Sequence, residues 1–92
     1  MNRDLSGYVK DFYLPTYEQI PDMGLYLEQT VKYVNNCFEN FPEMQLTASM
    51  VSNYVKKGLI SNPVKKLYYR EQIAHLIFIA ATIRIIMYQM SN

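Results

Sequence analysis

Four prolines set the limits within which this chain of 92 residues can form helices. Proline has no backbone N–H to donate, and it disfavours helical backbone in the residue before it. Pro15 and Pro21 therefore exclude a long helix from the first 21 residues, and Pro42 ends any helix that reaches it. Pro63 follows Ser-Asn in a turn signal. The stretches between these points have room for three helices.

The stretch after Pro21 has the apolar period of a helix. Its apolar residues step by three or four positions, as one helix face requires: Leu27, Val31, Val34, Phe38 and Phe41. Asp22 stands where an N-cap is needed, because its carboxylate can accept an orphan amide at the helix start. We predict a first helix from Asp22 to Phe41.

A second, shorter helix is predicted from Ala48 to Lys57. Thr47 is its expected N-cap, and Gly58 stands where a left-handed residue usually closes a helix. The segment from Val64 to Tyr69 is expected to hold a short extended piece.

The third predicted helix begins near Arg70 and is apolar almost all the way round. A helix of this kind is buried by its own domain or by a partner chain. One candidate cover is the N-terminal segment, where Tyr8, Val9, Phe12 and Tyr13 are spaced for one or two helical turns. The other is a second copy, and we favour a homodimer through the 70–90 helix.

The length predicts one domain, and the three expected helices predict a mainly all-α fold. We divide it into an aromatic arm, residues 1–21, packed on a helix-turn-helix domain, residues 22–92. The apolar run from Leu76 to Ile83 is far shorter than the roughly 20 residues of a membrane span, and no signal peptide precedes the arm. The single cysteine, Cys37, cannot form an internal disulfide, so a cytoplasmic protein without membrane contact is expected.

Catalytic chemistry is not indicated. There is one histidine, His75, and the three glycines form no phosphate-binding loop. Cys37 has no base near it in sequence and lacks the partners of a zinc site. We predict no enzyme activity, no metal, no cofactor and no small-molecule effector.

Charge is divided unequally along the chain. Residues 1–46 carry three basic and seven acidic side chains, a net charge of −4. Residues 47–92 carry six basic and one acidic, a net charge of +5. This asymmetry indicates a surface that meets an anion, although a solvated basic patch is an equally simple interpretation.

The basic half contains the pattern of a DNA-reading helix, namely a capped short helix, a basic turn and a long helix. Small polar side chains on such a helix can reach base edges in the major groove, and lysines beside it can hold phosphates. The candidate nucleic-acid-binding residues are Thr47, Ser49, Ser52, Asn53, Lys56, Lys57, Lys65, Lys66 and Arg70. The same polar residues also suit an ordinary surface helix.

The segment resembles the DNA-binding head of the MerR family of winged helix-turn-helix regulators. The residues that carry the resemblance are Thr47, Val51, Tyr54, Gly58-Leu59-Ile60, Pro63, Tyr68, Leu76 and Ile79. The resemblance implies a winged helix-turn-helix fold with a very short wing and a long C-terminal helix. It also implies a DNA-binding transcriptional regulator, with double-stranded DNA as the partner.

A bacterial family of domains of unknown function with a MerR-like head is more similar still, over roughly residues 20–86. The shared residues are Pro21-Asp22, Leu25-Tyr26, Gln29, Leu46-Thr47, Met50, Asn53 to Lys56, Pro63, Lys65-Lys66, Tyr68, Arg70-Glu71 and Leu76-Ile77.

The chain also departs from the MerR pattern. Ser52 stands where that family usually has arginine, Asn53 where it has an aromatic residue, and Lys66 where its longer wing has arginine. These departures favour a second hypothesis, in which the helix-turn-helix scaffold binds a protein partner and not DNA.

Overall fold

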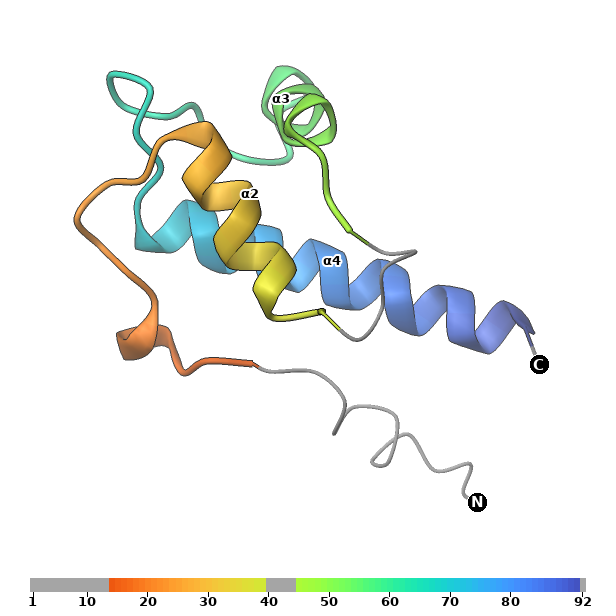
Figure 1. Cartoon of the computed structure of the whole chain (residues 1–92). Coiled ribbons are helices and arrows are strands. Elements are labelled where there is room, and N and C mark those ends of the chain that lie inside the picture. The colour runs from red at the N-terminus through yellow and green to blue at the C-terminus, as the bar shows by residue number, and fades with distance from the viewer. Residues whose placement is uncertain (1–13, 40–44, 92) are drawn as a thin grey trace.

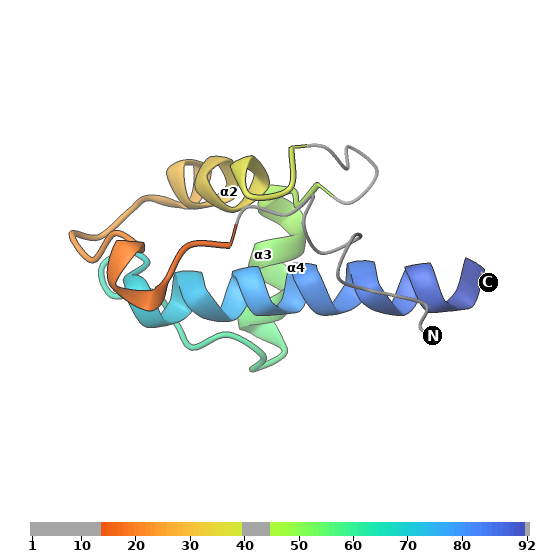
Figure 2. The same ribbon diagram turned by 90° about the horizontal axis from the view of Figure 1, so that it is seen from below.

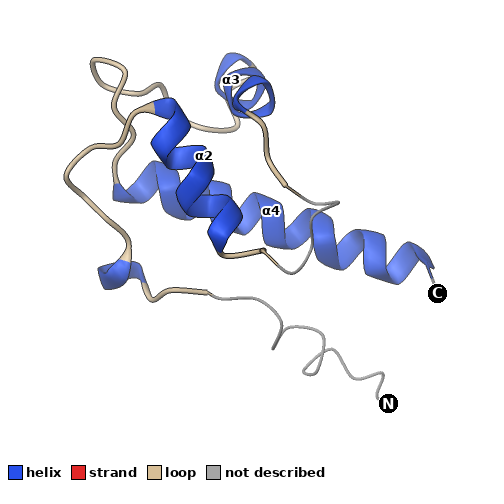
Figure 3. Ribbon diagram, viewed as in Figure 1, coloured by secondary structure: helices blue, strands red, loops and turns tan. Residues whose placement is uncertain are grey.

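The computed structural model describes residues 14–39 and 45–91, and within them the chain is mainly helical (Figures 1 and 3). A 3₁₀ turn, η1 (Tyr17–Gln19), precedes three α-helices: α2 (Leu27–Asn36), α3 (Ala48–Lys56) and α4 (Arg70–Ser91). Extended pairing in these residues is limited to two isolated bridges. Helix α4 forms a long base, and α2 packs against both α3 and α4 (Figures 1 and 2).

Helix α2 is shorter than the predicted helix. It begins at Leu27 and not at Asp22, and Asn36 is its last residue. The prediction was wrong at the start because Gly24 has a positive φ of 92° and Leu25 pairs with Tyr68 in an antiparallel bridge. Phe41 and Pro42, where the helix was expected to end, lie outside the described residues.

Helix α3 confirms the predicted start and is one residue shorter at its end. The Thr47 hydroxyl accepts a hydrogen bond from the Met50 N–H at 3.1 Å, as an N-cap should. At the other end Gly58 has φ +80°, and the Leu59 N–H donates to the Tyr54 carbonyl at 2.9 Å. The Gly58 N–H donates to the Val55 carbonyl, which completes a Schellman motif.

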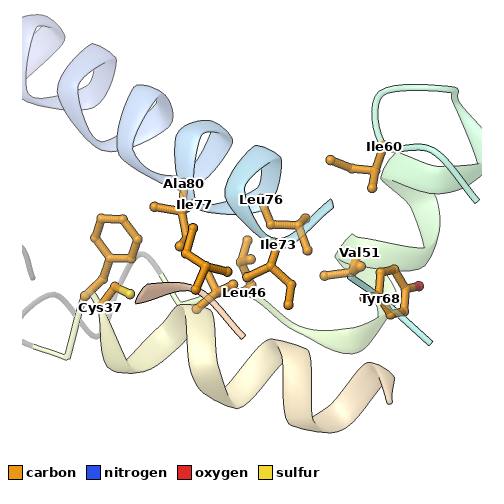
Figure 4. Packing of buried hydrophobic residues seen from close by; sticks show 12 residues of the cluster. Cys37, Leu46, Val51, Ile60, Tyr68, Ile73, Leu76, Ile77 and Ala80 are labelled. Atoms are coloured by element: carbon orange, nitrogen blue, oxygen red, sulfur yellow. The ribbon is translucent and has the colours of Figure 1, made fainter. Parts of the chain in front are cut away.

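Helix α4 confirms the predicted start at Arg70 and supplies a large part of the core. Its inward residues Ile73, Leu76, Ile77 and Ala80 are buried against side chains from α2, α3 and the connecting segments (Figure 4). The partners include Val34, Cys37, Phe38, Leu46, Val51, Ile60 and Tyr68. None of the described helices is both long and apolar enough to cross a membrane.

A side-chain amide fixes the approach of the chain to α3. The Asn35 Nδ2 donates to the Leu46 carbonyl at 3.0 Å, and the Leu46 N–H donates to Asn35 Oδ1 at 2.8 Å. The amide thus pairs with both polar backbone groups of one residue, as a neighbouring strand would. This pairing links the end of α2 to the residue before the α3 N-cap.

The substitution Asn35→Ala should lower the free energy of unfolding by about 1–3 kcal/mol. It leaves the half-buried N–H and carbonyl of Leu46 without their partner. Chemical denaturation followed by circular dichroism measures the loss. The matched control is Asn36→Ala, at the next and exposed position. Equal losses in the two variants would show that the amide pairing contributes nothing specific.

Candidate nucleic-acid interface

Helix α3 presents its predicted polar residues to solvent. The side chains of Ser49, Ser52, Asn53 and Lys56 are exposed, whereas Val51, between them in sequence, is fully buried. Lys57, just past the end of the helix, is exposed as well. The exposed stripe carries hydroxyl, amide and ammonium groups, which can donate to base edges or phosphates. The hydroxyl of Thr47 is engaged in the N-cap, so it is less available than the others.

The segment after α3 closes into the shortest form of β-hairpin. Val64 and Leu67 exchange two backbone hydrogen bonds, of 3.0 and 2.9 Å, around the two residues Lys65 and Lys66. These lysines have positive φ values of 53° and 72°, the pattern of a type I′ turn. We call residues 64–67 the wing tip. The expectation of an extended piece from Val64 to Tyr69 was therefore wrong at Lys65 and Lys66, which form the turn, and both lysine side chains lie in solvent.

The wing tip is held by two connections to the rest of the domain. Leu25 and Tyr68 exchange backbone hydrogen bonds of 2.9 and 2.8 Å, which attach the hairpin to the segment before α2. The buried Gln72 is the second connection. Its Nε2 donates to the carbonyls of Ser61 and Asn62 at 3.1 and 2.8 Å, while its Oε1 accepts from the Tyr69 N–H at 2.7 Å.

The backbone of the wing tip is strained for lysine. A non-glycine residue in the left-handed region costs about 1–2 kcal/mol, and type I′ turns therefore favour Asn-Gly. Replacing Lys65-Lys66 by Asn-Gly should raise the free energy of unfolding by about 1–2 kcal/mol, because the new residues tolerate positive φ. Thermal and chemical denaturation measure the gain.

The matched control for this change is Lys65→Gln with Lys66→Gln. It removes the same two charges and leaves the backbone strain in place, so its stability should stay near that of the parent protein. A gain as large as that of the Asn-Gly variant would mean that charge repulsion, and not φ, is relieved.

Arg70 faces the N-terminal arm. Its Nε donates to the Ile20 carbonyl at 2.9 Å, and its Nη2 donates to the Glu18 carbonyl at 3.4 Å. The guanidinium carbon lies 5.4 Å from the centre of the Tyr17 ring. The Arg70 backbone N–H donates to Asp22 Oδ1 at 3.0 Å, so Asp22 caps α4 and not the helix for which it was predicted. The guanidinium that was grouped with the lysines is thus engaged by the arm.

The substitution Arg70→Gln should lower the free energy of unfolding by about 1–3 kcal/mol. It removes the guanidinium donors from the Ile20 and Glu18 carbonyls and the cation from the Tyr17 ring. Denaturation by urea measures this effect. Lys57→Gln removes one charge from an exposed side chain and should leave stability within about 0.5 kcal/mol of the parent. Similar losses would argue against a structural role for Arg70.

Helix α3 and the wing tip project from the side of the domain opposite α4 (Figure 1). A groove of about 600 Å³ lies between the wing tip and the start of α2. Lys66 and Pro63 line one side of it, and Tyr26 and Glu28 line the other. The Tyr26 side chain is 59% exposed. The sequence did not predict that it lies beside the hairpin.

Two further side chains with reactive groups, Cys37 and His75, lie in the described part of the chain. Burial raises the pKa of the Cys37 thiol to about 11, and the thiol donates to the Tyr33 carbonyl at 3.7 Å. The thiolate, which is the nucleophilic form, is therefore scarce at neutral pH. His75 is exposed on α4. The described residues contain no group of three or more His, Cys, Asp or Glu that could hold a metal ion.

The chain belongs to the family described as the domain of unknown function DUF1836, whose sequence pattern matches residues 15–90. No curated protein and no solved structure matches the chain.

Proposed function

We propose that this member of the DUF1836 family binds double-stranded DNA through the face formed by α3 and the wing tip. The observation that carries the proposal is the shared exposure of two elements: the polar stripe of α3 and the two lysines of the hairpin that follows it. A short capped helix beside a basic hairpin can enter the major groove while the hairpin contacts the flanking phosphates.

The residues divide into two roles in this proposal. Ser49, Ser52 and Asn53 contact bases, since hydroxyl and amide groups read base edges. Lys56, Lys57, Lys65 and Lys66 contact phosphates. Arg70 would have to leave the arm carbonyls to reach a phosphate, so we assign it the smallest share of the binding energy.

We propose further that the fold is a MerR-like winged helix-turn-helix and that the protein is a transcriptional regulator. The supports for this step are the capped α3 with a glycine exit, the hairpin that follows, and the long α4. A homodimer through the 70–90 helix would present two such faces, as palindromic operators require. The exposed Ile86 and Met90 near the end of α4 favour that contact.

Fluorescence anisotropy with a labelled duplex of mixed sequence, at low salt and at two higher salt concentrations, tests the proposal. We expect micromolar binding that falls steeply with salt. Replacing Lys65 and Lys66 by Gln should reduce the slope of log affinity against log salt by about 1.8, because each phosphate contact contributes about 0.9. A control, Lys32→Gln on α2, should leave the slope unchanged.

Absence of binding at low salt, or an equal slope in all variants, would overturn the assignment of this face. The alternative function is a protein-interaction module on the same scaffold. Large exposed apolar side chains, Met23 and Phe78 among them, favour it. In that case substitution of these residues, and not of the wing lysines, would abolish binding to the partner.

A further inference from the structure

The groove between the wing tip and the start of α2 gathers hydrogen-bond donors that have no partner in the described part of the chain. The first turn of α2 forms part of its wall. Helix α2 has no side-chain cap, whereas Thr47 caps α3 and Asp22 caps α4. Among the described residues nothing accepts a hydrogen bond from the N–H groups of Leu27 and Glu28. The open start of a helix carries a partial positive charge and attracts anions.

A buried hydroxyl group lies at the same groove. Tyr68 lines the groove, yet the residue is only 4% exposed. Its backbone groups pair with Leu25, and its hydroxyl points away from Val51 (Figure 4). Within the described residues that hydroxyl has no hydrogen-bond partner. Burial of an unpaired hydroxyl costs free energy, which an oxygen of a bound ligand would recover.

Two further donors complete the set. The Gln29 Oε1 accepts from the Tyr26 N–H at 2.8 Å, so the nitrogen of this amide is left to donate into the groove. The Lys66 side chain is exposed at the opposite wall, on a backbone whose φ of 72° is unfavourable for lysine. Strained backbone of this kind is concentrated at binding sites. Backbone amides, an ammonium and a hydroxyl are the donors that bind a phosphate group.

We propose that this groove binds one phosphodiester of the DNA strand that runs beside the wing tip. The phosphate lies between the start of α2 and Lys66, and it accepts from the Tyr68 hydroxyl. The walls formed by Tyr26 and Pro63 suit the carbons of the adjoining deoxyribose, which a free phosphate ion lacks. The inference rests on the proposed function, because it extends the DNA-binding face from α3 and the wing tip to the start of α2.

Glu28 sets the strength of this site. Its carboxylate lines the groove in the first turn of α2, opposite Lys66, and the two side chains form no ion pair in the described structure. The carboxylate repels any anion in the groove, so a free phosphate ion binds weakly. A phosphodiester already held by the neighbouring contacts of α3 binds as part of the same strand, at a high effective concentration.

Nuclear magnetic resonance with inorganic phosphate tests the site without DNA. The full chain is titrated with phosphate, and sodium chloride of the same ionic strength is the control. We expect saturable shifts of the Leu27 and Glu28 amide resonances in phosphate. Glu28→Gln keeps the shape of the side chain, removes the repulsion and should bind phosphate several-fold more tightly. Absence of the shifts, equal shifts in chloride, or unchanged affinity in Glu28→Gln would overturn the site.

A pair of variants tests the contact with DNA. Tyr68→Phe should weaken binding of the mixed-sequence duplex several-fold, measured by fluorescence anisotropy. It should leave the protein at least as stable as the parent, because the lost hydroxyl has no partner in the described residues. Tyr69→Phe removes the hydroxyl of the next residue, which does not line the groove, and should leave duplex binding unchanged. Equal affinity of Tyr68→Phe and the parent, equal losses in both variants, or a less stable Tyr68→Phe would overturn the inference.

The two experiments separate the failure of this inference from the failure of the function on which it rests. Duplex binding that falls steeply with salt but is unchanged in Tyr68→Phe removes only the groove from the DNA-binding face. Absence of duplex binding overturns the proposed function and, with it, the DNA strand as the source of the phosphate. Saturable amide shifts in inorganic phosphate would then assign the groove to a free phosphorylated ligand.

Discussion

The buried amide of Gln72 is the interaction on which the arrangement of this domain most depends. It accepts from the backbone at the start of α4 and donates to two carbonyls in the connection between α3 and the wing tip. Asn35 does the same for the connection that enters α3. In the described residues these two amides fix the connections on either side of α3.

Much of the helical architecture could be predicted from the sequence, because local chemistry decides it. Thr47 and Gly58 mark both ends of α3 by capping and by tolerance of positive φ, and both act as expected. The apolar period also identified Val34 and Phe38, which are buried in the core. Asp22 misled the prediction of α2 because its carboxylate is equally suited to capping a helix 48 positions further along the chain.

The features that escaped sequence reasoning all depend on distant contacts. Lys65-Lys66 is not a recognised signal for a type I′ turn. The hairpin follows instead from the pairing of Leu25 with Tyr68 and from the hydrogen bond that Gln72 donates to the Asn62 carbonyl. Arg70 was grouped with the lysines because a sequence shows which side chains are charged but not where they point. In the folded chain the Arg70 guanidinium faces the arm. The exposure of Tyr26 could not be predicted, because only folding brings this residue beside the wing tip.

The pairing of Asn35 with Leu46 also bears on how the protein ages. Asparagine and glutamine are chemically labile side chains, and hydrolysis of their amides leaves a carboxylate, which can only accept hydrogen bonds. At Asn35 that change would set an anionic oxygen against the Leu46 carbonyl and turn an attraction into a repulsion. Deamidation of Asn35 would therefore loosen the connection that leads into α3 without any change in α3 itself.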